Sequence, residues 1–104
     1  MTYQLTVLYN QPDDPAAFDA YYEQTHAPLA AGLPGLQSFT ATRPEPGRGG
    51  EPAAVYLVAE LRFADQAAFG AAMSGERGRA AAADVANFAT GGATLLTGEV
   101  ITYV

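Results

Sequence analysis

The sequence contains no cysteine and no lysine, and only 15% of its residues are charged. The absence of cysteine excludes disulfide bonds, thiol nucleophiles and thiolate metal sites. All five cationic residues are arginines, and they are scattered along the chain without forming a basic stripe. Because the formal net charge is −6, the chain repels nucleic-acid phosphates and anionic lipids, so we expect neither as a partner.

Long apolar runs are also missing. No uninterrupted apolar segment is long enough to cross a bilayer. Residues 1–10 alternate in polarity and lack the basic start and apolar run of a signal peptide, so we expect a cytoplasmic protein. Hydrophobic residues make up 49% of the 104 positions, which is typical of one folded domain. We therefore expect a single domain over residues 1–104.

The hydrophobic periodicity predicts the order strand, helix, strand, strand, helix, strand. The expected strands cover residues 2–10, 36–43, 54–63 and 93–104, and Gly98 can introduce a bulge into the last one. The expected helices cover residues 15–31 and the region from Asp65 to Gly91, with a break at Ser74 and Gly75. This order builds an α+β fold, a four-stranded antiparallel sheet with both helices on one face.

Helix starts and an inward helical stripe can be located in the sequence. Asp14 can cap the first helix, Pro15 suits its first position, and Asp65 can cap the second helix. Helical spacing predicts that one stripe of the first helix faces inward: Phe18, Tyr22, Thr25 and Leu29.

Prolines interrupt two segments. Pro28 lies within the first helix, and we expect it to loosen the backbone near His26 and Ala27. Residues 44–52 contain three prolines and three glycines, which predicts an exposed loop. Whether this loop acts as a lid stays open.

Apolar residues occur on both faces of the expected strands. A sheet face that meets water is usually more polar than this. Together with the low charge content, the pattern indicates that a second copy of the chain covers the open face of the sheet.

Three blocks of the sequence resemble the EthD family, and they follow the family's order. They are LTVLYNQP at 5–12; FDAYYEQTHAPL at 18–29 with the LPGL turn at 33–36; and ANFATGG at 86–92 followed by LLTGE at 95–99. The motif Tyr-Tyr-x-x-Thr-His-x-Pro-Leu within the second block is distinctive. The three blocks cover most of the chain.

The resemblance implies a ferredoxin-like βαββαβ fold that pairs into a dimeric α/β barrel. The family takes its name from a protein tied to ethyl tert-butyl ether degradation. Related barrels include cofactor-free aromatic monooxygenases, polyketide cyclases of secondary metabolism, muconolactone isomerases and some haem-degrading enzymes. The fold alone does not choose among these activities.

His26, the only histidine, is the first candidate for catalysis. Imidazole can accept or donate a proton near neutral pH, and His26 follows Tyr22 by four residues, so both can face one cleft. The alternative is a histidine that bonds to the local backbone. Asn87 is the second candidate, because its amide could hold a carbonyl or enolate oxygen. Its alternative is a side chain that terminates a helix at the Gly-Gly turn.

Aromatic residues and one acid are the candidates for substrate binding. Tyr9, Tyr22, Phe39 and Tyr56 could line an apolar pocket for a ring-bearing ligand, and the alternative is an ordinary core, which we favour for Phe39 and Tyr56. Glu60 could act as a base, or it could pair with Arg62 on the same strand face. With one histidine, no cysteine and no carboxylates at ligand spacing, we expect no metal site.

Our leading hypothesis is an isomerase, cyclase or lyase that needs no cofactor and acts on a small hydrophobic carbonyl compound, such as a lactone or polyketide-like ring. His26 would move the proton, and Asn87 or a tyrosine hydroxyl would hold the oxyanion. Two alternatives are a cofactor-free monooxygenase and a non-catalytic dimeric protein that binds a ligand in a degradation or biosynthetic pathway. Haem binding by His26 is a further, less favoured alternative.

Overall fold

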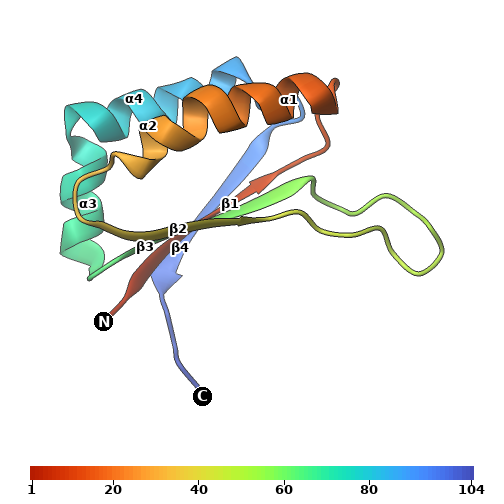
Figure 1. Cartoon of the computed structure of the whole chain (residues 1–104). Helices are drawn as coiled ribbons and strands as arrows, with labels where there is room; N and C mark the ends of the chain where they lie inside the picture. Colours follow the sequence, from red (N-terminus) through yellow and green to blue (C-terminus); the bar gives the residue numbers. More distant parts are fainter.

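The computed structural model describes residues 1–104, and its elements follow the predicted order (Figure 1). The elements are β1 (Tyr3–Tyr9), α1 (Pro15–Tyr21), the π-helical turn η1 (Tyr22–His26), α2 (Ala27–Ala31), β2 (Leu36–Thr42), β3 (Leu57–Phe63), α3 (Gln66–Ser74), α4 (Glu76–Asp84), the 3-10 turn η2 (Val85–Asn87) and β4 (Ala93–Glu99). The break predicted at Ser74 and Gly75 separates α3 from α4.

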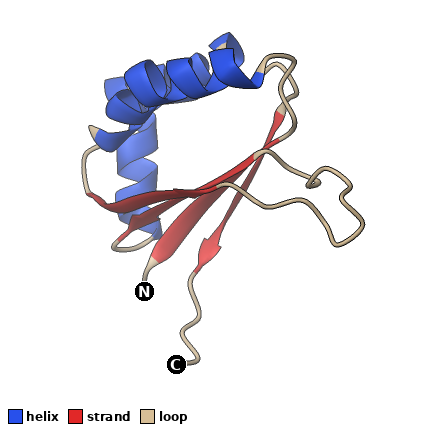
Figure 2. Ribbon diagram, turned by 45° about the vertical axis from the view of Figure 1, so that its right-hand side comes forward, coloured by secondary structure: helices blue, strands red, loops and turns tan.

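The strands form one antiparallel sheet in the order β2-β3-β1-β4, and the helices cover one of its faces (Figure 2). The expected α+β, ferredoxin-like arrangement is therefore confirmed. In the central strands every second residue is buried beneath the helices, as Val7 and its partner Ala59 illustrate. This alternation follows from the period of two residues in a strand. No helix of the structure is long and apolar enough to span a membrane.

The two helix caps form as predicted. The Asp14 carboxylate accepts a hydrogen bond from the Ala17 N–H at 3.1 Å, with Pro15 at the first helical position. The Asp65 carboxylate accepts one from the Ala68 N–H at 2.8 Å. Both caps satisfy N–H groups that have no partner inside the helix, and they fix where each helix begins.

All four strands are shorter than predicted, and β3 and β4 differ most, because their pairing stops where β1 ends. β3 begins at Leu57, opposite Tyr9, the last residue of β1, so residues 54–56 lie outside the strand. β4 ends at Glu99, opposite Tyr3, the first residue of β1, so residues 100–104 lie outside the strand.

The bulge expected at Gly98 is not present. Gly98 pairs in register with Gln4, and β4 contains no extra residue opposite β1. The irregularity lies instead in β2, between Leu36 and Ser38. The loop over residues 44–52 is largely exposed, as predicted, and it extends away from the helical layer (Figure 1).

The π-helical turn η1 lies directly before the proline of α2. The Ala27 N–H donates to the Tyr22 carbonyl, which is five residues back instead of four. Pro28 has no backbone N–H, and its ring would clash with the carbonyl four residues earlier in a regular α-helix. The wider turn relieves this clash, so the loosening predicted near His26 is confirmed.

This turn also decides which side chains face the sheet. In a regular α-helix, with about 100° per residue, position 25 would lie about 20° from the direction of Phe18 and position 26 about 80° away. The wider turn inserts one extra residue, so Tyr22, His26 and Ala30 are buried. Thr25 is exposed, and its predicted place in the inward stripe is wrong.

Candidate functional site

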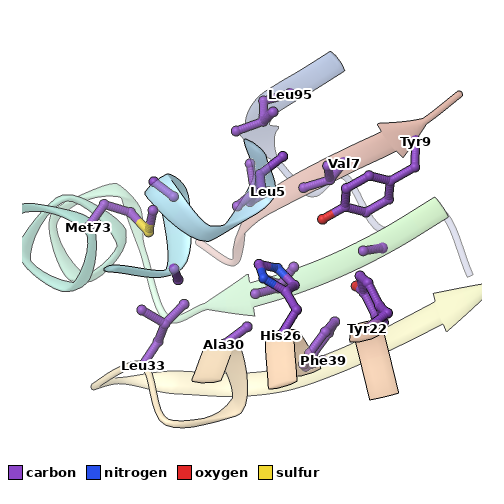
Figure 3. A pocket seen from close by; sticks show the side chains of 15 residues that line it. Leu5, Val7, Tyr9, Tyr22, His26, Ala30, Leu33, Phe39, Met73 and Leu95 are labelled. Atoms are coloured by element: carbon purple, nitrogen blue, oxygen red, sulfur yellow. The ribbon is translucent and has the colours of Figure 1, made fainter. Parts of the chain in front are cut away.

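A small cavity of about 40 Å³ lies between the sheet and the helices (Figure 3). Fourteen of its 15 lining residues are hydrophobic, and the remaining one is His26. A water molecule needs about 10–15 Å³ of such space, so the cavity admits a group of only a few non-hydrogen atoms. An apolar pocket with a few convergent polar groups is the usual form of a small-molecule site.

His26 projects from η1 into this cavity (Figure 3). The residue is only 5% exposed, and its ring contacts the rings of Phe88 and Tyr22, at centroid distances of 4.6 and 5.2 Å. Its Nδ1 lies 2.9 Å from Oδ2 of Asp84, whereas Nε2 makes no hydrogen bond to the protein. One ring nitrogen is therefore held, and the other is free to meet a ligand.

Asp84, the last residue of α4, is a site residue that we did not predict. The residue is 8% exposed, and Oδ1 of its carboxylate accepts hydrogen bonds from the Tyr21 hydroxyl at 2.6 Å and from the Asn87 amide at 3.0 Å. The sequence does carry a signal for it, because Ala81, Asp84 and Phe88 share one helical face and all three are buried. An acid on an otherwise apolar stripe indicates a buried partner.

The surroundings of Asp84 favour its ionised form. Burial raises the pKa of Asp84, but hydrogen bonds from Tyr21, Asn87 and His26 outweigh this effect, and the pKa falls below its usual value. The same contact acts in reverse on Tyr21, whose hydroxyl is held protonated because its pKa is raised by the bond to Asp84 and by burial.

The depressed pKa of Asp84 predicts a loss of stability in acid. The contribution of a carboxylate whose pKa is lowered on folding is fully present above its unfolded pKa of about 3.9. It disappears as the pH falls from there through the lower pKa of the folded protein. Urea unfolding across this pH range is expected to show that acid lowers the free energy of unfolding less for Asp84→Asn than for the wild type. Equal acid losses in both proteins would contradict the prediction.

Two tyrosine hydroxyls lie beside His26 in the cavity (Figure 3). Burial and then the neighbouring Tyr22 hydroxyl raise the pKa of Tyr9 above its usual range, and burial raises the pKa of Tyr22 to about 12. Both groups therefore stay protonated at neutral pH. The Tyr22 hydroxyl is buried without a hydrogen-bond partner, although Tyr9 lies nearby. Such an unpaired group is destabilising and calls for an explanation.

The other predicted site residues divide into two groups. Phe39 lines the cavity together with His26, Tyr9 and Tyr22. Asn87 does not, because it is exposed and its amide is engaged by Asp84.

Tyr56 and Glu60 lie outside the cavity. The Tyr56 hydroxyl donates to Asp19 at 2.8 Å, and the guanidinium of Arg43 lies over its ring at 4.6 Å from the centroid. Glu60 is on the sheet face opposite the helices, where the Arg62 guanidinium bonds to Gln4 and makes no ion pair with Glu60. The period of two along β3 carries a signal that separates Glu60 from the cavity, because Ala59 and Leu61, which line it, point to the other face of the sheet.

No three histidine, aspartate or glutamate side chains come together in a way that could hold a metal ion. The polar groups available at the cavity are thus one imidazole and two phenols, with a carboxylate behind the imidazole. This set can move a proton and can donate hydrogen bonds to an oxygen atom.

The fold and this site define a ferredoxin-like α+β protein with an apolar cavity between its sheet and its helices. The EthD domain pattern matches residues 10–92, and the chain belongs to the EthD family. An EthD family protein from Bacillus halodurans C-125 is 38% identical, with a TM-score of 0.90 over 97% of this chain and 100% of the other. An uncharacterised 11.0 kDa protein from the thcB–thcC intergenic region of Rhodococcus erythropolis is 45% identical over 90% of both chains.

More distant structures share the fold alone. SnoaB from Streptomyces nogalater, a cofactor-independent oxygenase, is 16% identical with a TM-score of 0.68, over 99% of this chain and 95% of the other. A dimeric ferredoxin-like protein of Thermobifida fusca is also 16% identical, with a TM-score of 0.71 over 96% of this chain and 92% of the other. The fold thus carries at least one cofactor-independent activity in another protein.

Proposed function

We propose that this protein transfers a proton next to the carbonyl group of a small hydrophobic substrate, as an isomerase, cyclase or lyase that needs no cofactor. The observation that carries the proposal is the buried imidazole of His26, which lines an apolar cavity and is held at Nδ1, so that only Nε2 has no partner in the protein. Two protonated phenols beside it can bind an oxygen atom. We also propose that the protein is cytoplasmic and that residues 1–104 form a single domain.

The reaction begins with Nε2 of His26 removing a proton from the carbon beside the carbonyl. The electron pair of the broken C–H bond moves onto the carbonyl oxygen, and the Tyr22 hydroxyl donates a hydrogen bond to this oxyanion. The imidazolium then returns the proton to the same or another carbon. Asn87 cannot take the role of oxyanion donor that we considered, because its amide donates to Asp84 outside the cavity.

The size of the cavity limits the substrate. A volume of about 40 Å³ holds the compact carbonyl end of a molecule, such as that of a lactone, and the remainder of a larger polyketide-like ring would have to extend out of the cavity.

The proposal can be tested without the natural substrate, by following hydrogen exchange at the carbon beside a carbonyl. Acetone, cyclopentanone and γ-butyrolactone are incubated in D₂O with the protein, and deuterium incorporation is measured by NMR. We expect exchange above the buffer rate that saturates with the probe. If all three probes exchange at the buffer rate, the proposal is wrong; saturable binding without exchange would favour a non-catalytic binding protein.

Tyr22→Phe is expected to lower activity and to raise stability. Removing one donor to an oxyanion costs about 100-fold to 1000-fold in rate. Removing a buried hydroxyl that has no partner should increase the free energy of unfolding by about 1 kcal/mol. Exchange rates and urea unfolding measure the two effects, and Tyr21→Phe, which loses a paired hydroxyl, serves as the control for the unfolding measurement. A Tyr22→Phe protein that is less stable than the wild type would contradict this prediction.

A cofactor-free monooxygenase is the second candidate, and the shared fold of SnoaB favours it. Both reactions begin by removing a proton from the substrate, and they differ in the need for oxygen. Consumption of oxygen that matches the formation of product would identify the monooxygenase. Unchanged turnover under nitrogen would identify the proton-transfer reaction.

We propose that the protein works as a homodimer in which the sheets pair into a dimeric α/β barrel. The sheet face away from the helices carries the cross-strand pair of Leu8 and Val58, together with Leu96, which is 53% exposed. In the tail beyond β4, Ile101 and Tyr103 are 65% and 88% exposed. A second copy would remove this apolar surface from water.

Leu96→Arg is expected to convert the dimer into a monomer, because a buried interface would have to accept an unpaired charge. Light scattering at micromolar concentration should give the dimer mass for the wild type and the monomer mass for the variant. Ala80→Arg, on the exposed side of α4, is the matched control and should stay dimeric. A monomeric wild type would refute the homodimer.

A further inference from the structure

The carboxylate of Asp84 lies behind the imidazole of His26, and the two residues come from different helices. We propose that Asp84 is a positioning residue that holds the His26 proton on Nδ1 and so makes Nε2 the basic nitrogen in the cavity. This inference deepens the proposed function, because it says which nitrogen performs the proton transfer and what selects it.

The hydrogen bond itself selects the tautomer. An ionised carboxylate can only accept hydrogen bonds, so the contact of 2.9 Å between Oδ2 and Nδ1 requires the proton to be on Nδ1. A neutral imidazole with its proton on Nδ1 has its lone pair on Nε2. That nitrogen has no partner within the protein, and it is the one available to the cavity.

The other side of Asp84 is arranged so that the carboxylate stays ionised and fixed. Oδ1 accepts from both Tyr21 and Asn87, and neither of these donors contacts Oδ2. The second oxygen is thus left for His26 alone. This gives Asn87 a role different from the one predicted, since it supports the carboxylate and lies outside the cavity.

The imidazole has little freedom to choose another partner. Its ring packs against those of Tyr22 and Phe88, and it is almost fully buried. When Nε2 gains a proton, the resulting cation is already paired with the Asp84 carboxylate in a site from which water is largely excluded. Such a prearranged charge stabilises the protonated state as it forms.

A purely structural role would be different. In that case the contact would only tie α4 to η1, and the position of the proton on the ring would have no consequence. The two roles can be separated by measurements that report the tautomer and the rate without depending on stability.

The tautomer can be read directly, because His26 is the only histidine. Uniformly ¹⁵N-labelled protein gives one pair of imidazole nitrogen signals, recorded in the pH range in which the ring is neutral. We expect the shift of a protonated nitrogen for Nδ1 and of an unprotonated nitrogen for Nε2. A wild-type spectrum with the proton on Nε2 overturns the proposal, and this measurement requires no variant to fold.

Asp84→Asn tests whether the Asp84 carboxylate is what holds the proton on Nδ1 of His26. We expect the preference for a proton on Nδ1 to weaken, so that the two nitrogen shifts move towards each other. Asp19→Asn, which removes a carboxylate bonded to Arg43 on the outer side of α1, should keep the wild-type spectrum. Circular dichroism verifies that both variants fold. A folded Asp84→Asn protein with wild-type nitrogen shifts would show that the carboxylate does not select the tautomer.

Rates distinguish this inference from the proposed function. In the ketone exchange assay, Asp84→Asn should lower kcat by about 100-fold and leave KM nearly unchanged. If the wild type exchanges no probe but carries its proton on Nδ1, the proposed function fails and the assignment of Asp84 stands. If the wild type exchanges probes with its proton on Nε2, the function stands and the role of Asp84 fails.

Discussion

Replacing His26 by glutamine is expected to abolish the exchange of ketone hydrogens, with a loss of at least about 1000-fold in rate. Glutamine has no group that can take up a proton near neutral pH. Its amide N–H can still donate to Asp84, so the buried carboxylate keeps a partner. The variant therefore removes the chemistry while it disturbs the surroundings less than alanine would.

The test of His26→Gln needs a neighbour as control. Thr25 belongs to the same π-helical turn and is exposed, so Thr25→Gln places the same side chain one residue away. Exchange is measured by NMR and folding by urea unfolding. We expect Thr25→Gln to be fully active. A folded His26→Gln protein that exchanges the probes at the wild-type rate would refute the proton-transfer proposal.

The fold was predictable from the sequence because its signals are local. Alternating residues in β1 and β3 report a strand with one covered face, and both strands appear with that face buried. Asp14 and Asp65 cap helices through hydrogen bonds that span only three residues. The ends of β3 and β4 were harder to predict, since they depend on the length of the neighbouring strand and not on their own residues.

The candidate site was predictable only in part. His26, Tyr9, Tyr22 and Phe39 do line one cavity, but the reason that His26 faces inward is the wider turn before Pro28. Regular helical spacing favours Thr25 for that position, and only the extra residue of the π turn reverses the preference. A proline shows that a helix is disturbed, but it does not show by how many degrees the side chains rotate.

Asp84 escaped prediction for a different reason. Its partner His26 is 58 residues away in sequence, and contacts at that distance are set by how the two helices pack on the sheet. Asn87 lies only three residues from Asp84, and its bond to the carboxylate decides that it faces away from the cavity. The residue type of Asn87 alone suggested a donor to an oxyanion. In the folded protein its amide donates to the Asp84 carboxylate instead.

Phe88→Ala is expected to cost about 3–5 kcal/mol in the free energy of unfolding, which is the usual range for removing a buried phenylalanine. Its ring is 5% exposed and lies at the centre of a cluster of rings. The cluster consists of Tyr9, Phe18, Tyr21, Tyr22 and His26, all with ring centroids within 5.6 Å of that of Phe88. Small domains are stable by about 5–15 kcal/mol, so this loss is large.

Urea unfolding measures the loss, and Phe69→Ala is the matched control. Phe69 contacts Tyr3 and Phe63 at the other end of the core and is only half-buried, so its removal should cost less.

Phe88→Leu keeps most of the volume of the side chain and should lower the free energy of unfolding by less than about 1.5 kcal/mol. Because leucine removes the ring that lies against His26, it should still slow the exchange of probes. Wild-type exchange in a stable Phe88→Leu protein would show that this ring supports the fold and has no part in orienting His26.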